Sequence, residues 1–197
     1  MFTNAVDTAI ATEPVRGVDG RRRRGAASRD LILDAATGVI GTGGPSSVTH
    51  RAVAQAAGVP LARVAYHFPT IDDLLEASAN RYLADFDARL GAMAAQAVAG
   101  RRSMLEACTD FLQDLVTSGS GQFLAMVEVR IALARTGRTV APAGAVEVVG
   151  AFGADPARAV SIVSALFGFA VLAATEPTPV PRAAIRAHVA TVLGVTA

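Results

Sequence analysis

Two short helical patterns joined by a tight turn occupy residues 46–75, and this segment restricts the possible folds more than any other. Thr49 is a typical helix N-cap, because its hydroxyl can accept a hydrogen bond from a first-turn N–H. Gly58 ends the first pattern, since glycine adopts the left-handed backbone that a short turn needs. Pro60 suits the start of a second helix, which ends before Pro69. This arrangement predicts a helix-turn-helix, whose second helix enters the major groove of DNA.

The same segment carries a resemblance to a known family. Residues 57–75 read AGVPLARVAYHFPTIDDLL, which resembles the signature of TetR-type one-component transcriptional regulators. Residues 31–44 read LILDAATGVIGTGG and resemble the first helix of that family with its glycine turn. The chain departs from the family at residues 60–63, at Ala65 and at Ile71, so the target sequence of relatives does not transfer. The resemblance implies a three-helix DNA-binding domain followed by a variable helical domain for ligand binding and dimerisation.

The distribution of charge divides the chain into two parts. All 18 basic residues are arginine; residues 1–70 hold eight of them against five acids, and residues 71–197 hold ten against twelve. The amino-terminal part therefore attracts polyanions such as DNA, and the remainder does not. With 52% hydrophobic residues the chain can build a core. A single cysteine, Cys108, excludes an internal disulfide framework, and no signal peptide is visible, so we expect a cytoplasmic protein.

Glycine and proline positions predict an all-α chain in three parts. Residues 1–24 show no sustained period and are expected to form a flexible basic arm. Residues 25–72 are expected to form the helix-turn-helix DNA-binding domain, with Ser28 capping its first helix. Residues 73–197 are expected to form the helical ligand-binding and dimerisation domain. Its helices, including the one that links the two domains, are predicted at 71–99, 102–117, 122–136, 143–152, 156–175 and 181–193.

The candidate DNA contacts lie in the helix-turn-helix. Arg63 would project early from the recognition helix, where a guanidinium can bind guanine O6 and N7. Arg51 lies at a position that some members of the resembled family use to touch DNA, although exposed arginine is also common on any surface. Contacts to a thymine methyl group are assigned to Pro60, Leu61 and Ala62, and contacts to phosphates to Thr49, His50, Tyr66 and His67.

Two of these assignments have alternatives. Tyr66 and His67 could instead seal the three-helix core beside Phe68, because both side chains are amphipathic. The arginine run at residues 21–24 could reach the minor groove as a basic arm, or could be a tail without contacts. Its members are Arg21, Arg22, Arg23 and Arg24.

Two charges interrupt an apolar helical pattern at residues 123–134. Glu128 and Arg130 have no opposite charge three or four residues away, so they need a tertiary partner, solvent or a ligand. One of them could anchor a ligand in an apolar pocket; a structural salt bridge is the alternative. The candidate apolar lining, for which ordinary core packing is the alternative, is Met104, Cys108, Phe111, Phe123 and Met126.

Residues 157–175 form a long apolar run that is nearly long enough to span a bilayer. Arg158 lies inside it, which favours a helix buried all round in a soluble oligomer, so no membrane partner is expected. Two apolar faces need two partners, of which one is the body of the subunit and the other the mate in a homodimer. Which face meets the mate is not decided by sequence. The two predicted stripes are Ile162, Ala165, Leu166, Phe169, Leu172 and Val163, Phe167, Ala170, Ala174.

Other chemistries lack support in the sequence. The GTGG stretch at residues 41–44 follows a helix and lacks the G-K-[ST] of a phosphate loop. Three histidines, the last at His188, show no metal-ligand or catalytic spacing, so neither cofactor nor enzymatic activity is expected.

We therefore predict a ligand-responsive DNA-binding transcription regulator. It would be a homodimeric repressor that a small molecule of unidentified chemistry releases from a palindromic double-stranded DNA operator. The alternative is a small-molecule-binding or enzymatic helical protein whose degenerate helix-turn-helix no longer binds DNA.

Overall fold

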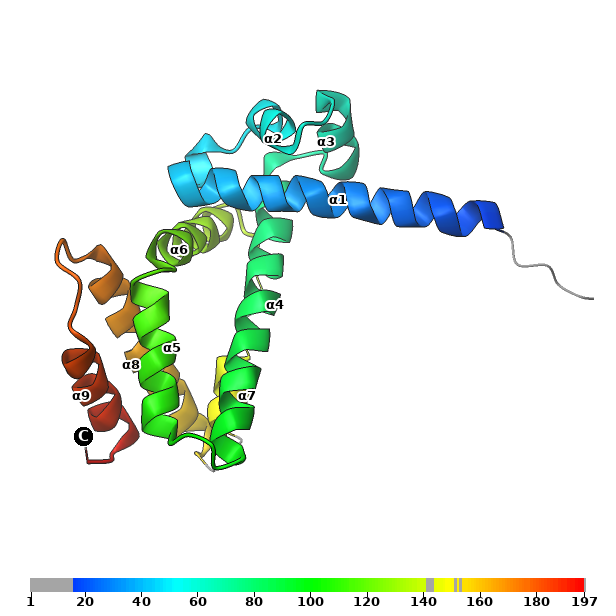
Figure 1. Cartoon of the computed structure of the whole chain (residues 1–197). Helices are drawn as coiled ribbons and strands as arrows, with labels where there is room; N and C mark the ends of the chain where they lie inside the picture. The colour runs from blue at the N-terminus through cyan, green and yellow to red at the C-terminus, as the bar shows by residue number, and fades with distance from the viewer. Residues whose placement is uncertain (1–15, 141–143, 151, 153, 197) are drawn as a thin grey trace, which may run out of the picture.

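The computed structural model describes residues 16–140, 144–150, 152 and 154–196, with side chains from Arg23 onward. Within these ranges the secondary structure is helical and no strand occurs, which confirms the all-α class. Helix α4 connects a layer of three helices at one end to a bundle at the other (Figure 1). The elements are α1 (Arg16–Gly43), a 3-10 turn η1 (Pro45–Ser47), α2 (His50–Ala57), α3 (Leu61–His67), α4 (Ile71–Val98), α5 (Met104–Val116), α6 (Ser120–Arg135), α7 (Ala145–Gly150), α8 (Pro156–Thr175) and α9 (Arg182–Leu193).

The carboxy-terminal helices lie where the glycine and proline positions predict them. The predicted range 156–175 coincides with α8, and the other ranges differ from the observed ends by at most two residues. Residues 143 and 151 of the range predicted for α7 lie outside the described residues.

The first helix differs from its prediction. It begins at Arg16, so Ser28 lies inside α1 and does not cap it, and the arginines at 21–24 belong to a helix and not to an irregular arm. Arginine is a strong helix former, and extending a helix that is already docked adds one hydrogen bond per residue without a new nucleus. Residues 1–15 of the predicted arm lie outside the described residues. The amino-terminal end of α1 extends beyond α4 (Figure 1).

Local capping sets the geometry of the two short helices and of α4. The Thr49 hydroxyl accepts a hydrogen bond from the Ala52 N–H at 3.0 Å, as predicted. Gly58 has φ of 64° and ψ of 33°, the left-handed conformation that ends α2. Thr70 and Asp73 form a reciprocal capping box, with both hydrogen bonds at 3.1 Å, which starts α4 directly after α3.

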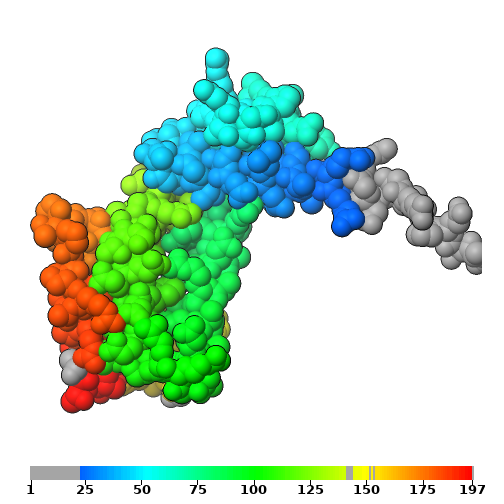
Figure 2. All heavy atoms as spheres, viewed as in Figure 1, coloured from blue at the N-terminus to red at the C-terminus, as the bar shows by residue number. Residues whose placement is uncertain are grey.

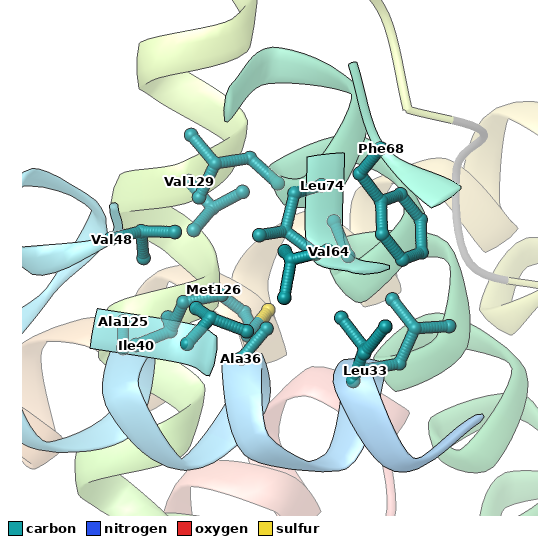
Figure 3. Close-up of a cluster of buried hydrophobic side chains, with 14 of the residues drawn as sticks. Leu33, Ala36, Ile40, Val48, Val64, Phe68, Leu74, Ala125, Met126 and Val129 are labelled. Carbon is teal, nitrogen blue, oxygen red and sulfur yellow. The ribbon is translucent and has the colours of Figure 1, made fainter. Parts of the chain in front are cut away.

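The amino-terminal core draws on helices from both predicted domains. One buried cluster contains side chains from α1 and α3 together with Val48, the residue that follows η1. Leu74 of α4 and Val129 of α6 pack into the same cluster (Figure 3). Three helices of this size cannot bury their apolar faces alone, so α4 and α6 complete the core. The predicted boundary after residue 72 therefore falls inside α4 and inside one continuous core.

Within the single chain helix α8 is only partly buried, and its complete burial in an oligomer stays a prediction. It is the one described helix long and apolar enough to span a membrane, and only 22% of that apolar window is buried within the chain. Ile162 and Ala170 face inward, whereas Phe167 and Leu172 are exposed, so the predicted stripes are wrong. A helix turns by about 100° per residue, so each step of three residues falls about 60° short of a full turn. The predicted stripe contains several such steps between Ile162 and Leu172, so Leu172 no longer lies on the face of Ile162.

Candidate DNA-binding surface and internal cavity

Helices α2 and α3 lie on the outer side of α1, away from the rest of the bundle (Figures 1 and 2). Their buried side chains are small or β-branched: Val53 and Val64 are fully buried, and Ala54 is buried as well. Because each helix buries a single narrow face in this core, the remaining faces are open to solvent. Such an arrangement presents α3 to a partner as large as a DNA groove.

The solvent face of α3 carries the residues that the sequence assigned to base contacts. Arg63 and Ala62 are exposed, and Leu61 keeps 52% of its surface exposed, which leaves an apolar side chain available for a thymine methyl group. Pro60 precedes them as the N-cap residue and is also exposed. Tyr66 is 82% exposed, so the alternative in which it seals the core is wrong.

The two histidines of this region are partly committed to the fold. Nε2 of His50 lies 2.7 Å from the carbonyl oxygen of Phe68, which ties the start of α2 to the end of α3. A carbonyl oxygen only accepts, so Nε2 is the donor in this contact. His67 is half-buried, and its ring lies 6.4 Å from the Phe68 ring, so packing and phosphate contact both remain compatible with its position. Thr49 remains exposed while it caps α2.

Arginines surround this face. Arg51 on α2 and Arg23 and Arg24 on α1 are exposed, and among the described residues none has a carboxylate within 4.0 Å. The side chains of Arg21 and Arg22 lie outside the described residues. Arg29, which was not predicted as a contact, lies with its guanidinium carbon 5.1 Å from the centre of the Phe68 ring. The sequence could have indicated Arg29 as a candidate DNA contact, because it follows the arginine run at residues 21–24 on the same helix.

A cavity of about 820 Å³ lies among α4, α5, α6, α7 and α8. Its volume falls within the range of about 300–1,000 Å³ that is usual for small-molecule sites. Of the seven predicted ligand contacts, six line this cavity: Met104, Cys108, Phe111, Phe123, Met126 and Arg130.

The sequence analysis missed several aromatic side chains of the cavity wall. Tyr82 and Phe86 contribute from α4, and Phe167 from α8. The Phe86 and Phe111 rings meet edge to face at 5.2 Å, as do those of Phe123 and Phe167 at 5.6 Å. Tyr82 and Phe86 stand four residues apart, a helical spacing that could have indicated a second apolar face on this long helix.

Burial favours the neutral forms of the Cys108 thiol and the Tyr82 phenol in the cavity wall. Desolvation raises the pKa of the Cys108 thiol to about 11, so a reactive thiolate does not form near neutral pH. Burial also raises the pKa of Tyr82 above its ordinary value. Within the described ranges no three His, Cys, Asp or Glu side chains are arranged as a metal site. The cavity is therefore suited to binding by shape and apolar contact.

Glu128 lies outside the cavity, unlike Arg130. It is exposed on the opposite side of α6, and a Cβ placed on Gly44 would lie 2.7 Å from its Oε2 atom. Gly44 has φ of +68° and follows the end of α1, so Glu128 contacts the turn that leads into the helix-turn-helix. The two charges stand two residues apart, which is about 200° around the helix, so they cannot face the same partner.

Helix α6 belongs to both halves of the protein. Val129 and Leu133 are buried in the amino-terminal core, whereas Phe123 and Val127 belong to the carboxy-terminal cluster and line the cavity. Met126 takes part in both environments. A ligand that displaces the cavity side of α6 therefore acts on a helix that is packed into the DNA-binding core.

An ion-pair cluster joins the end of α6 to the start of α4. Arg138 donates to Asp73 and to Glu76 at 2.9 Å each and lies 3.9 Å from Asp72. Hydrogen bonds from Thr70 and from Arg138 lower the pKa of Asp73, so its carboxylate is charged wherever the protein is folded near neutral pH. This cluster ties the segment after α6 to the first turns of α4, the helix that follows α3.

Comparisons with known proteins agree with this geometry. The family description "Bacterial regulatory proteins, tetR family" matches residues 32–78. The fold is similar to that of a TetR-family member from Streptomyces coelicolor A3, with 27% identity, a TM-score of 0.71, and coverage of 84% of this chain and 97% of that one. It is also similar to the multidrug binding protein EbrR complexed with ethidium, with 27% identity, a TM-score of 0.68, and coverage of 84% and 98%. A search of curated proteins finds no match.

Proposed function

Since the chain belongs to the TetR family and is a DNA-binding transcription regulator, we propose that it is a homodimeric repressor, which a small molecule releases from a palindromic operator. The observation that supports ligand control most directly is the double role of α6. One face of this helix is buried in the DNA-binding core, and the other lines the cavity. A ligand that alters the cavity therefore changes the free-energy balance between conformers of the reading domain.

DNA recognition would depend on α3 and the arginines around it. Arg63 would read a guanine, and the apolar side chains at its amino-terminal end would meet a thymine methyl group. Arg51, Tyr66 and the basic end of α1 would contact phosphates and set the register. The exposure of Arg63, Arg51 and Tyr66 supports these roles.

A small-molecule effector is supported by the size and chemistry of the cavity. EbrR, which this chain resembles, is described as a multidrug binding protein in complex with ethidium. The same mode of control in this chain would use the aromatic wall formed by α4, α5 and α8. An enzymatic role is disfavoured because burial suppresses the thiolate form of Cys108, the one potential nucleophile of its type in the cavity.

Dimerisation would cover the exposed apolar face of α8. Phe167 and Leu172 are both exposed on α8, and Ala183, Ala187 and Thr191 expose a row of small side chains along the neighbouring α9. Two such helix pairs related by a twofold axis would form a four-helix bundle. A dimer of this kind places two reading heads on two half-sites, and a cytoplasmic location follows from a chromosomal operator.

The competing function is a helical small-molecule-binding protein that no longer binds DNA. Ala65 and Ile71 favour it, because they replace residues that many family members place at DNA. The exposed arginines on α1, α2 and α3 disfavour it.

Binding to the DNA upstream of the protein's own gene separates the two functions. Fluorescence anisotropy with that DNA, compared with random DNA of equal length, should show specific binding whose affinity falls steeply with salt. Arg135→Ala, which removes an exposed arginine from α6 and not from the helix-turn-helix, should bind like the wild type. Equal weak affinity for specific and random DNA would favour the non-regulatory function.

A further inference from the structure

The cavity is lined by more basic than acidic side chains, and the basic ones are less engaged by other protein groups. Arg130 and Arg158 both line the cavity, and both remain exposed, which places them at its rim. Asp155 is the one acidic residue among the described lining residues. The rest of the wall is mainly apolar and aromatic, so a ligand that enters gives up water and meets few polar groups.

Carboxylates outside the cavity pair with most of the other arginines that follow the recognition helix. Six arginines outside the cavity each lie within 4.0 Å of an Asp or Glu side chain: Arg81, Arg89, Arg102, Arg138, Arg182 and Arg186. In the part of the chain that is described, Arg130 and Arg158 have no such partner. Arg101 and Arg135 also lack one, but they do not line the cavity. The cavity therefore retains positive charge that the protein itself does not compensate.

The nearby carboxylates are already engaged by backbone groups. Asp155 caps α8 and accepts a hydrogen bond from the Arg158 N–H at 3.0 Å. Asp87, on α4 beside α7, accepts one from the Gly144 N–H at 2.8 Å. Arg158 donates through Nη2 to the Leu193 carbonyl at 3.3 Å, which leaves Arg130 as the lining arginine with no protein acceptor among the described residues. A cationic ligand would meet repulsion here, whereas an anionic group would meet an unpaired guanidinium.

We propose that the effector is an apolar aromatic monoanion, whose body fills the cavity and whose carboxylate or sulfonate pairs with Arg130. Arg158 adds a second positive charge at the same rim. This inference rests on the proposed function, because it names the ligand class of the same cavity. The low dielectric of the aromatic wall strengthens the ion pair relative to one on an open surface, and the exposure of Arg130 makes it sensitive to salt.

Two fluorescent dyes with the same ring system test the ligand class. 1-Anilinonaphthalene-8-sulfonate carries one negative charge, and N-phenyl-1-naphthylamine lacks the sulfonate and is neutral. Each is titrated into the full-length wild type and into Arg130→Met, which keeps an apolar stem of similar length, with Arg135→Met as a control from the same helix. Arg130→Lys, which keeps the charge, serves as the rescue variant. Circular dichroism and thermal melting establish that each variant is folded.

Arg130→Met should raise the Kd of the sulfonate dye about tenfold, since a hydrogen bond to a charged group contributes at least this factor. The Kd of the neutral dye should change less than twofold, and Arg130→Lys should recover most of the loss. Arg135→Met should behave like the wild type with both dyes.

Three further outcomes separate failure of the ligand class from failure of the cavity. If the neutral dye binds and the sulfonate dye shows no dependence on Arg130, the anionic class is overturned and an effector cavity remains. Tighter binding of ethidium, an aromatic cation, than of the sulfonate dye would likewise overturn the class. If neither naphthalene dye binds the wild type, the proposed effector site fails together with this inference.

Discussion

Leu172→Glu should convert the protein into a folded monomer that no longer binds a palindromic operator. Leu172 lies on the outer face of α8 with 67% of its surface exposed in the single chain, and it does not line the cavity. Phe167 is a less specific target, because it is exposed but also lines the cavity. Val98→Glu is the matched control, since Val98 is a 73% exposed apolar residue at the far end of α4.

The expected magnitude follows from the area that a mate would cover. Full burial of a leucine side chain contributes about 1.5–3 kcal/mol, so covering the exposed two-thirds contributes about 1–2 kcal/mol. A twofold interface repeats the contact, which gives about 2–4 kcal/mol per dimer before the cost of desolvating two carboxylates is added. The dimer dissociation constant should therefore rise by at least about a hundredfold.

Sedimentation equilibrium over a micromolar concentration range measures this constant for all three proteins. We expect a dimer for the wild type and for Val98→Glu, and a monomer for Leu172→Glu. The monomer should lose operator affinity, because a single reading head lacks the enhancement that linked half-sites provide. A wild type that sediments as a monomer, or a Leu172→Glu dimer within tenfold of the wild-type constant, would refute the assignment of this face.

Three other changes test the reading head, its turn and the acid stability. Arg63→Ala should cost about 1–3 kcal/mol of operator affinity and relax base preference at one half-site position; an equal loss on random DNA would contradict base readout. Gly58→Ala should lower the free energy of unfolding by about 1–2 kcal/mol through backbone strain alone, because φ is +64° and no atom lies within 4 Å of the added Cβ; an unchanged urea midpoint would contradict this. Hydrogen bonds from Arg186 and Arg182 lower the pKa of Glu106 from 4.5 to about 2, so the stability they provide is present above pH 4.5 and lost as the pH falls toward 2. Arg186→Gln should make the urea midpoint less dependent on pH in that window, and an unaltered acid limb would exclude this ion pair as its cause.

Capping and turn chemistry made much of the fold predictable from sequence. Thr49, Gly58 and Thr70 act on backbone groups within four residues of themselves, so their roles do not depend on distant packing. The length of α1 was not predictable in the same way. Ser28 has the chemistry of an N-cap, yet it lies within a helix whose docked carboxy-terminal half supports extension back to Arg16.

The candidate cavity shows the same division. Soft and aromatic residues predicted five of its lining residues, because apolar faces must be buried somewhere. Only the tertiary structure showed that Arg130 lies at the cavity and Glu128 at the turn after α1. The sequence gives the angle between the two side chains around α6, but the packing of neighbouring helices decides what each side of α6 contacts. The exposed face of α8 was decided in the same way, because α5, α6, α7 and α9 determine which of its apolar side chains are covered. Contacts between residues near in sequence follow from the chemistry of those residues. Which of several apolar faces is buried depends instead on the free energy of packing the whole chain.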